Sequence, residues 1–104
     1  MIIVHVEIDF AEAIFLNPNT HPAFAAMESA TREEPGCLKY VSSIDVHDAR
    51  VLRIYEEWAS MEQLEPHFAT QHMATFQAAL SGLKSVSMTA KVYDVSGELP
   101  FPNR

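Results

Sequence analysis

The sequence predicts one α+β domain in which helices cover a single face of an antiparallel sheet. Residues with alternating apolar character predict strands near both ends of the chain and in a central hairpin, and stretches with apolar residues at helical spacing lie between them. A length of 104 residues, 48% of them hydrophobic and 20% charged, suits a single core. We expect a folded core over residues 1–96 and an irregular tail over 97–104, within one domain spanning 1–104.

The first strand and the first helix each have a clear pattern. Residues 2–8 alternate between an aliphatic face and a face that carries His5 and Glu7, which is typical of a half-buried strand. Residues 10–19 match no clear element. A helix is predicted from near Thr20 to no later than Glu34, because Pro35 and Gly36 follow. Its expected inner stripe is Phe24, Met27 and Ala30.

Two further strands are predicted at residues 38–46 and 51–58, and the short connection at 47–50 makes them a hairpin. In the first strand, one face is expected to carry Leu38, Tyr40, Ser42 and Ile44. In the second, one face carries Leu52, Ile54, Glu56 and Trp58, and the opposite face carries Val51, Arg53, Tyr55 and Glu57. Glu56 and Glu57 therefore point to opposite faces and form no paired carboxylate site.

A second helical region follows the hairpin. Ser60 and Gln63 form a capping box that opens a helix with the expected inner residues Met61, Leu64, His67 and Phe68. Pro66 should bend or shorten this helix. Thr70 or Gln71 can cap another segment, in which Met73, Phe76, Leu80 and Leu83 have helical spacing, and Gly82 marks its end. Residues 85–95 alternate again and predict a last strand.

The resulting order, β-α-β-β-α-α-β, is the split βαβ arrangement of ferredoxin-like folds. The predicted strands carry apolar residues on both faces, for example Ile3 against Val4, but the helices can cover only one face. We therefore expect a second copy of the chain to pack sheet against sheet, which makes the protein a homodimer.

Composition excludes several classes of function. Fourteen acidic residues against seven scattered basic ones give a net charge of −7, which disfavours nucleic acids and anionic membranes. The single cysteine, Cys37, allows no intrachain disulfide and no cysteine-based metal site, and a small apolar residue entering a strand is favoured over a reactive thiol. Three glycines allow neither a P-loop nor a dinucleotide fingerprint. The absence of a basic leader and of a long apolar span predicts a cytoplasmic protein.

Several short motifs resemble the antibiotic biosynthesis monooxygenase (ABM) family. They keep the family's order and spacing over about residues 31–95. These motifs are Glu34-Pro35-Gly36-Cys37-Leu38-Lys39-Tyr40, Tyr55-Glu56-Glu57-Trp58-Ala59-Ser60, Leu64-Glu65-Pro66-His67-Phe68, His72-Met73, Phe76 and Ala79-Leu80. Within the family, the chain looks most like the quinol monooxygenase group. Residues 10–19 and Pro66 depart from the usual pattern.

The resemblance implies a dimeric α/β barrel with a cavity between the sheet and the helices of each subunit. It also implies oxidation of a small quinol or polyphenol by molecular oxygen, with no metal and no organic cofactor. Another branch of the family degrades haem, using a histidine near the position of Gln77 and an asparagine on the first strand. This chain has neither, so haem degradation is disfavoured.

His67 is the first candidate for a catalytic residue. It lies on the expected inner stripe of the capped helix, and it matches the histidine of the family's "L-E-x-H" stretch. A histidine with a pKa near neutrality can take the proton from a phenol or quinol hydroxyl, and the resulting anion can pass an electron to oxygen. The alternative is a structural histidine bound to a backbone carbonyl or to water.

Five further residues are candidates for substrate binding. Trp58 can stack on a flat aromatic ring or simply pack in the core. His72 follows His67 by five residues, about 140° away on a continuous helix, so the two should share neither a face nor a metal, and His72 is expected near a helix start. The others are Phe76 as a pocket wall or core residue, His5 as a second base or an interface residue, and Tyr40 as a hydrogen-bond donor or packing residue.

Two other functions remain open at this stage. A non-catalytic protein could hold a small aromatic ligand in the same cavity, and a different enzyme, such as an isomerase or a haem-handling protein, could use the same fold. The state of His67 separates catalysis from binding. A free ring nitrogen facing a cavity favours catalysis, and two engaged nitrogens disfavour it.

Overall fold

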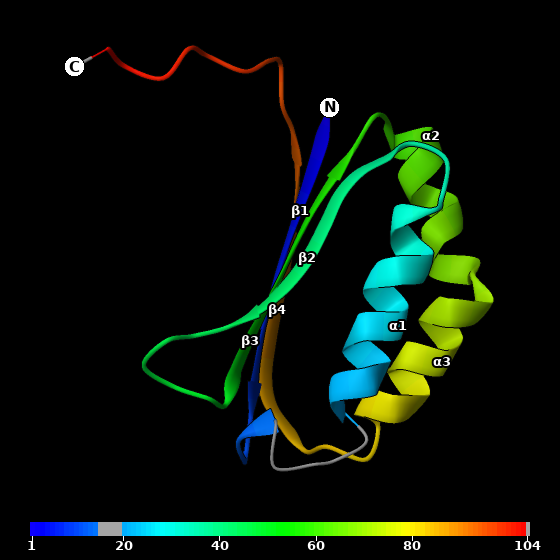
Figure 1. Cartoon of the computed structure of the whole chain (residues 1–104), viewed down its shortest axis with the longest axis vertical. Helices are drawn as coiled ribbons and strands as arrows, with labels where there is room; N and C mark the ends of the chain where they lie inside the picture. The colour runs from blue at the N-terminus through cyan, green and yellow to red at the C-terminus, as the bar shows by residue number, and fades with distance from the viewer. Residues whose placement is uncertain (15–19, 104) are drawn as a thin grey trace.

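A computed structural model describes residues 1–14 and 20–103, the side chains of Thr20 and His21 excepted. It contains a four-stranded antiparallel sheet with the strand order β2-β3-β1-β4 and helices on one face (Figure 1). The elements are β1 (Ile2–Phe10), α1 (Thr20–Arg32), β2 (Cys37–Ile44), β3 (Val51–Trp58), α2 (Met61–Leu64), the 3-10 helix η2 (Glu65–Ala69), α3 (Gln71–Leu80) and β4 (Ser85–Asp94). The predicted α+β ferredoxin-like fold and its element order are confirmed.

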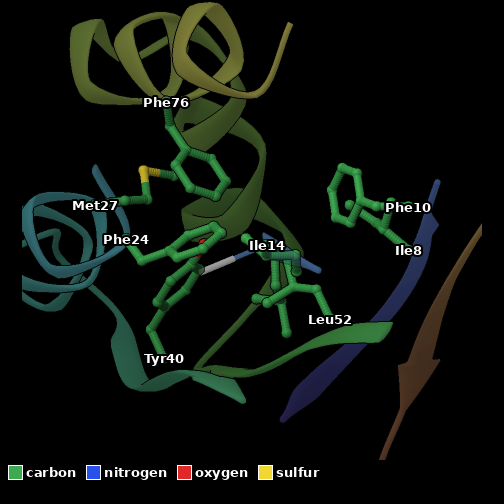
Figure 2. Close-up of a cluster of buried hydrophobic side chains, with 9 residues drawn as sticks. Ile8, Phe10, Ile14, Phe24, Met27, Tyr40, Leu52 and Phe76 are labelled. Atoms are coloured by element: carbon green, nitrogen blue, oxygen red, sulfur yellow. The ribbon is translucent and has the colours of Figure 1, made fainter. Parts of the chain in front are cut away.

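The helix-facing side of the sheet forms the core. The register pairs Val4 with Glu56 and Ile8 with Leu52, so the alternating buried residues of β1 and β3 meet on one face. Phe24 and Met27 of α1 and Phe76 of α3 pack onto this face together with Tyr40 of β2 (Figure 2). Ile14 is also fully buried there, although its surroundings matched no element in the sequence; residues 15–19 lie outside the described part of the chain.

The start of β2 departs from simple alternation. Cys37 pairs with Trp58 and Lys39 with Glu57, so Leu38 is an extra residue in the ladder. A bulge of this kind lets Cys37 and Tyr40 both contact the core and leaves Leu38 58% exposed. The expectation that Leu38 shares a face with Tyr40 is therefore wrong.

The second helical region is broken as Pro66 predicted. The Ser60 side chain caps α2 by accepting a hydrogen bond from the backbone N–H of Gln63, and Thr70 caps α3 through the N–H of Met73. Between them, η2 winds as a 3-10 helix with Pro66 in its first turn. This change of winding turns Leu64 and His67 inward but leaves Met61 and Phe68 41% and 57% exposed, so these two are not inner residues as expected.

The turn between α1 and β2 requires glycine. Gly36 has a φ of +84°, in the left-handed region that residues with a Cβ seldom adopt. A Cβ atom there would also collide with the side chain of Gln63, next to the capped start of α2. Gly36 thus lets the end of α1 and the start of α2 approach closely.

β4 is the least covered element. All ten of its residues are exposed, and four of them are large and apolar: Val86, Met88, Val92 and Tyr93. It pairs only with β1, so it forms one edge of the sheet. Residues 96–103 form no helix or strand and extend away from the sheet in Figure 1. Among the described residues, no helix is long and apolar enough to cross a membrane.

A candidate histidine and carboxylate site

His67 lies in the core between the sheet and the helices. Its side chain is fully buried, and its ring centroid is 5.1 Å from that of Trp58 at the end of β3 and 6.0 Å from that of Tyr40 in β2. The 3-10 winding of η2 places it there, directly over the end of the central hairpin. A titratable ring packed between two aromatic side chains needs polar partners, because burial without them is unfavourable.

Glu34 supplies one of these partners. It follows α1, in the turn that leads to Gly36, and its side chain is only 11% exposed. One carboxylate oxygen, Oε2, accepts from Nδ1 of His67 at 2.6 Å and from Nε2 of His72 at 2.7 Å. Because His72 lies in the first turn of α3, this single oxygen connects the end of α1 to both η2 and α3.

The second ring nitrogen of His67 has no such partner. When Nδ1–H donates to Glu34, Nε2 of the neutral ring carries a free lone pair. Nε2 is buried and, among the described residues, makes no hydrogen bond; its nearest carboxylate is Glu56, whose Oε1 is 4.0 Å away. The site therefore holds a histidine that is fixed at one nitrogen and free at the other.

Glu56 is itself positioned by Trp58. Its Oε1 accepts a hydrogen bond of 2.9 Å from the indole Nε1–H. Burial raises the pKa of the Glu56 carboxyl, and nearby Glu34 raises it further, whereas the Trp58 hydrogen bond and His67 act in the opposite direction. Because burial is the largest of these effects, the neutral form of Glu56 is favoured more strongly here than in water.

The structure overturns the expectation that His67 and His72 point to different faces. That expectation assumed one continuous helix, on which the two side chains would diverge. The chain instead changes winding at Pro66 and starts a new helix after Thr70, so both rings turn toward Glu34. One ligand atom from each of Glu34, His67 and His72 lies within 4.8 Å of the other two, a set that could hold a metal ion.

The structure brings four of the six candidate residues together: His67, Trp58, Tyr40 and His72. Phe76 packs against Phe24 in the core, with ring centroids 5.5 Å apart, and is not among the rings that contact His67 in the described residues. His5 pairs with Tyr55 and Lys91 on the sheet face that points away from the helices. It therefore lies apart from this site.

Sequence reasoning missed two groups of this cluster. Glu34 marks the end of a helix and opens a family motif, but nothing in the local pattern links it to histidines more than 30 residues later. Glu56 did leave a signal, since it occupies an inward position of β3 between Ile54 and Trp58. A carboxylate on the buried face of a strand indicates a partner in the core.

Two of the hollows in the described part of the chain border α1. One, of about 300 Å³, lies between α1 and the β2–β3 hairpin and is lined by Phe24, Ala25, Glu28, Ser42, Ser43, Ile44 and Leu52. The other, of about 400 Å³, is a groove between α1 and α3 lined by Ala23, Ala26, Met27, Ala30, Gln71, His72, Thr75 and Phe76. His72 borders the second groove, and His67 borders neither.

Two neighbouring groups are unsuited to ionise. Burial raises the pKa of the Tyr40 hydroxyl far above its usual value, and Glu56 and Glu28 add to the shift. Burial also raises the pKa of the Cys37 thiol, as do Glu34 and Glu56. A reactive cysteine needs a lowered pKa, so the structure favours a packing role for Cys37.

Comparison with solved structures supports the fold. A candidate antibiotic biosynthesis monooxygenase from Deinococcus radiodurans is similar with a TM-score of 0.82 at 23% identity, covering 99% of this chain and 100% of the other. Another antibiotic biosynthesis monooxygenase gives a TM-score of 0.79 at 26% identity, covering 93% and 100%. A conserved protein of unknown function from Bacteroides thetaiotaomicron, a candidate oxidoreductase, gives a TM-score of 0.69 at 23% identity. The match covers 88% of this chain and 94% of the other.

Sequence comparison gives the same family. No curated protein matches the chain significantly. The model of the family described as "Antibiotic biosynthesis monooxygenase" matches residues 1–79, a range that includes the Glu34, His67 and His72 cluster and its aromatic neighbours Tyr40 and Trp58. With a family model over most of its length and the same fold in solved members, the chain belongs to the antibiotic biosynthesis monooxygenase family.

Proposed function

We propose that the protein is a cofactor-independent monooxygenase that oxidises a small quinol or polyphenol with molecular oxygen, and that His67 is its general base. The observation that carries the proposal is the state of the His67 ring. Nδ1 is held by Glu34 at 2.6 Å, and Nε2 is buried without a hydrogen-bond partner among the described residues. A carboxylate that orients one nitrogen and leaves the other free is the arrangement that enzymes use for a histidine base.

The chemistry needs no further redox group. His67 Nε2 takes the proton of a hydroxyl, and the resulting anion passes one electron to oxygen. Recombination of the two radicals forms a peroxide anion, which takes the proton back from His67, and the resulting hydroperoxide loses water. For a quinol with a free ring position, the products are a hydroxyquinone and one water. The substrate supplies all four electrons, so one oxygen atom enters the product and the other leaves as water.

Access to Nε2 requires a movement of η2. His67 is fully buried, and neither hollow described above reaches it. The segment that covers it is a five-residue 3-10 helix with exposed Glu65, Pro66, Phe68 and Ala69. Hydrogen bonds in 3-10 helices have poorer geometry than those in α-helices, so this segment is the easiest part of the cover to displace. Trp58 and Tyr40 would then form the aromatic walls of the site.

Oxygen uptake tests the proposal. Tag-free protein is mixed with reduced naphthoquinols and flavonoid-like phenols, and uptake is compared with that of boiled protein. We expect saturable uptake whose kcat falls by about 10²–10⁴-fold in His67→Gln, since this is the usual contribution of a general base. The matched control is His47→Gln, an exposed histidine on the hairpin turn, which should keep full activity. Equal activity in His67→Gln and the wild type would remove His67 from the mechanism.

A binding function is the second candidate, and one observation favours it. The hollow between α1 and the hairpin has about the smallest volume that binds small organic molecules, and His67 is not part of it. Its lining combines apolar side chains with Glu28 and with the Ser42 hydroxyl, which is buried without a partner. Saturable binding of an oxidised naphthoquinone by calorimetry, together with oxygen uptake no faster than in boiled protein, would favour this function over catalysis.

We also propose that the protein is a homodimer. The helices leave one face of the sheet open within the described chain (Figure 1), and β4 lies at an edge of the sheet and exposes apolar side chains. A second copy would cover both. Light scattering at micromolar concentration should give twice the chain mass of 11.7 kDa. A single-chain mass over the whole concentration range would contradict this proposal.

A further inference from the structure

We infer that Glu34, His67 and His72 form a binding site for a divalent transition-metal ion such as Zn²⁺. The three side chains come from the turn after α1, from η2 and from the first turn of α3, and their ligand atoms lie within 4.8 Å of one another. Imidazole nitrogen and carboxylate oxygen are the ligands that Zn²⁺ and related ions take in proteins. This inference goes beyond the proposed oxidation and does not depend on it.

The distances suit an ion after a small adjustment. Glu34 Oε2 is 2.6 Å from Nδ1 of His67 and 2.7 Å from Nε2 of His72. Around a tetrahedral ion with bonds of about 2.0–2.2 Å, ligand atoms are roughly 3.4 Å apart. The oxygen and the nitrogens therefore need to separate by less than about 1 Å. Three protein ligands leave a fourth position for water.

The unpaired nitrogen of His67 is a second and independent observation. When Nδ1 binds an ion, the ring proton resides on Nε2, which becomes a donor. Glu56 Oε1, held in place by the Trp58 indole, is the carboxylate oxygen 4.0 Å from that nitrogen. Metal-bound histidines usually donate their second N–H to a carboxylate in this way. Metal binding would thus give a partner to a buried His67 atom that has none among the described residues, once Nε2 and Glu56 Oε1 close from 4.0 Å to hydrogen-bond distance.

The site also has a route to solvent. The His72 side chain is 25% exposed and borders the groove between α1 and α3, whereas Glu34 and His67 lie behind it at 11% and 0%. An ion arriving through the groove meets His72 first and then the other two ligands. The water in the fourth position can point into the same groove, which has a volume of about 400 Å³.

Titration of tag-free protein with Zn²⁺, followed by calorimetry, tests the site. We expect one ion per chain and an affinity that falls by more than about 100-fold in His72→Ala, because loss of an outer-shell partner alone costs about 10–100-fold. His72 is the partly exposed ligand, whose loss the fold should tolerate best. His47→Ala is the matched control, because it removes an exposed histidine elsewhere and should leave the affinity unchanged. Absence of saturable binding, or equal affinity in His72→Ala and the wild type, would overturn the inference.

A spectroscopic readout identifies the ligand atoms. In ¹⁵N NMR spectra of the imidazole rings, Zn²⁺ should move the His67 proton from Nδ1 to Nε2. Retention of the proton on Nδ1 at saturating Zn²⁺ would exclude His67 as a ligand and overturn the three-residue site. Neither measurement uses a quinol, so failure of the proposed oxidation and failure of the metal site are distinguished. If both hold, saturating Zn²⁺ should abolish the oxygen uptake that depends on His67, because Nε2 no longer has a free lone pair.

Discussion

Replacement of Trp58 with alanine is expected to lower the free energy of unfolding by about 3–5 kcal/mol, the usual range for a large aromatic residue in a core. Trp58 is fully buried and packs with Ile2, Val4 and Leu64. Its removal opens a cavity beside His67 and also takes away the N–H that Glu56 Oε1 accepts. The measurement is urea unfolding followed by circular dichroism, since the variant lacks the only tryptophan.

Two control variants separate the causes of this effect. Trp58→Phe keeps most of the aromatic volume but removes the indole N–H. Its decrease in the free energy of unfolding therefore reports mainly on the hydrogen bond to Glu56 and should be smaller, about 1–3 kcal/mol. Met61→Ala removes a side chain that is 41% exposed and should change stability by less than about 0.5 kcal/mol. If Trp58→Ala lowers the free energy of unfolding no more than Met61→Ala does, the Trp58 side chain does not contribute to the core.

Replacement of Glu34 with alanine is expected to lower the free energy of unfolding by about 1–3 kcal/mol. The carboxylate is the acceptor for Nδ1–H of His67, which is fully buried and cannot turn to water instead. His72 loses the same acceptor, but its side chain is 25% exposed and can be hydrated by water instead. His72 therefore contributes less than His67 to the decrease in stability. Chemical denaturation at neutral pH, without added metal, measures the loss.

The neighbouring residue provides the control for Glu34. Glu33 is an exposed glutamate in the same turn, and Glu33→Ala should be close to neutral. Glu34→Gln should fall between the two, because its single amide oxygen can still accept from both rings but lacks the negative charge that strengthens these hydrogen bonds. If Glu34→Ala and Glu33→Ala have equal stability, the two histidines do not depend on Glu34 for their position.

The fold could be predicted because its signals are local. Alternation in β1 and β3, the turn at Gly36, and the caps at Ser60 and Thr70 each specify an element from a few adjacent residues. Because connections between elements are short, the order of those elements allows only a few sheet topologies. The ferredoxin-like topology that we predicted is the one observed. The motif that contains His67 was equally local, which is why that residue stood out.

The site could be predicted only in part, because its contacts join distant segments. The bond between Glu34 and His67 spans 33 positions, and no periodicity reports such a pair. The exposure of Leu38 likewise follows from the pairing of β2 with β3, where one extra residue shifts the alternation.

By itself, the sequence determined the strands, the helices, their order and the break at Pro66, since each of these follows from local residue preferences. The tertiary structure alone decided how η2 and α3 are oriented on either side of Thr70, and hence that His67 and His72 meet at Glu34. The physical reason is that a helix break fixes where regular winding stops. The direction in which the chain continues depends on the packing of α3 against α1 and of the His67 ring of η2 against Trp58 and Tyr40 of the sheet.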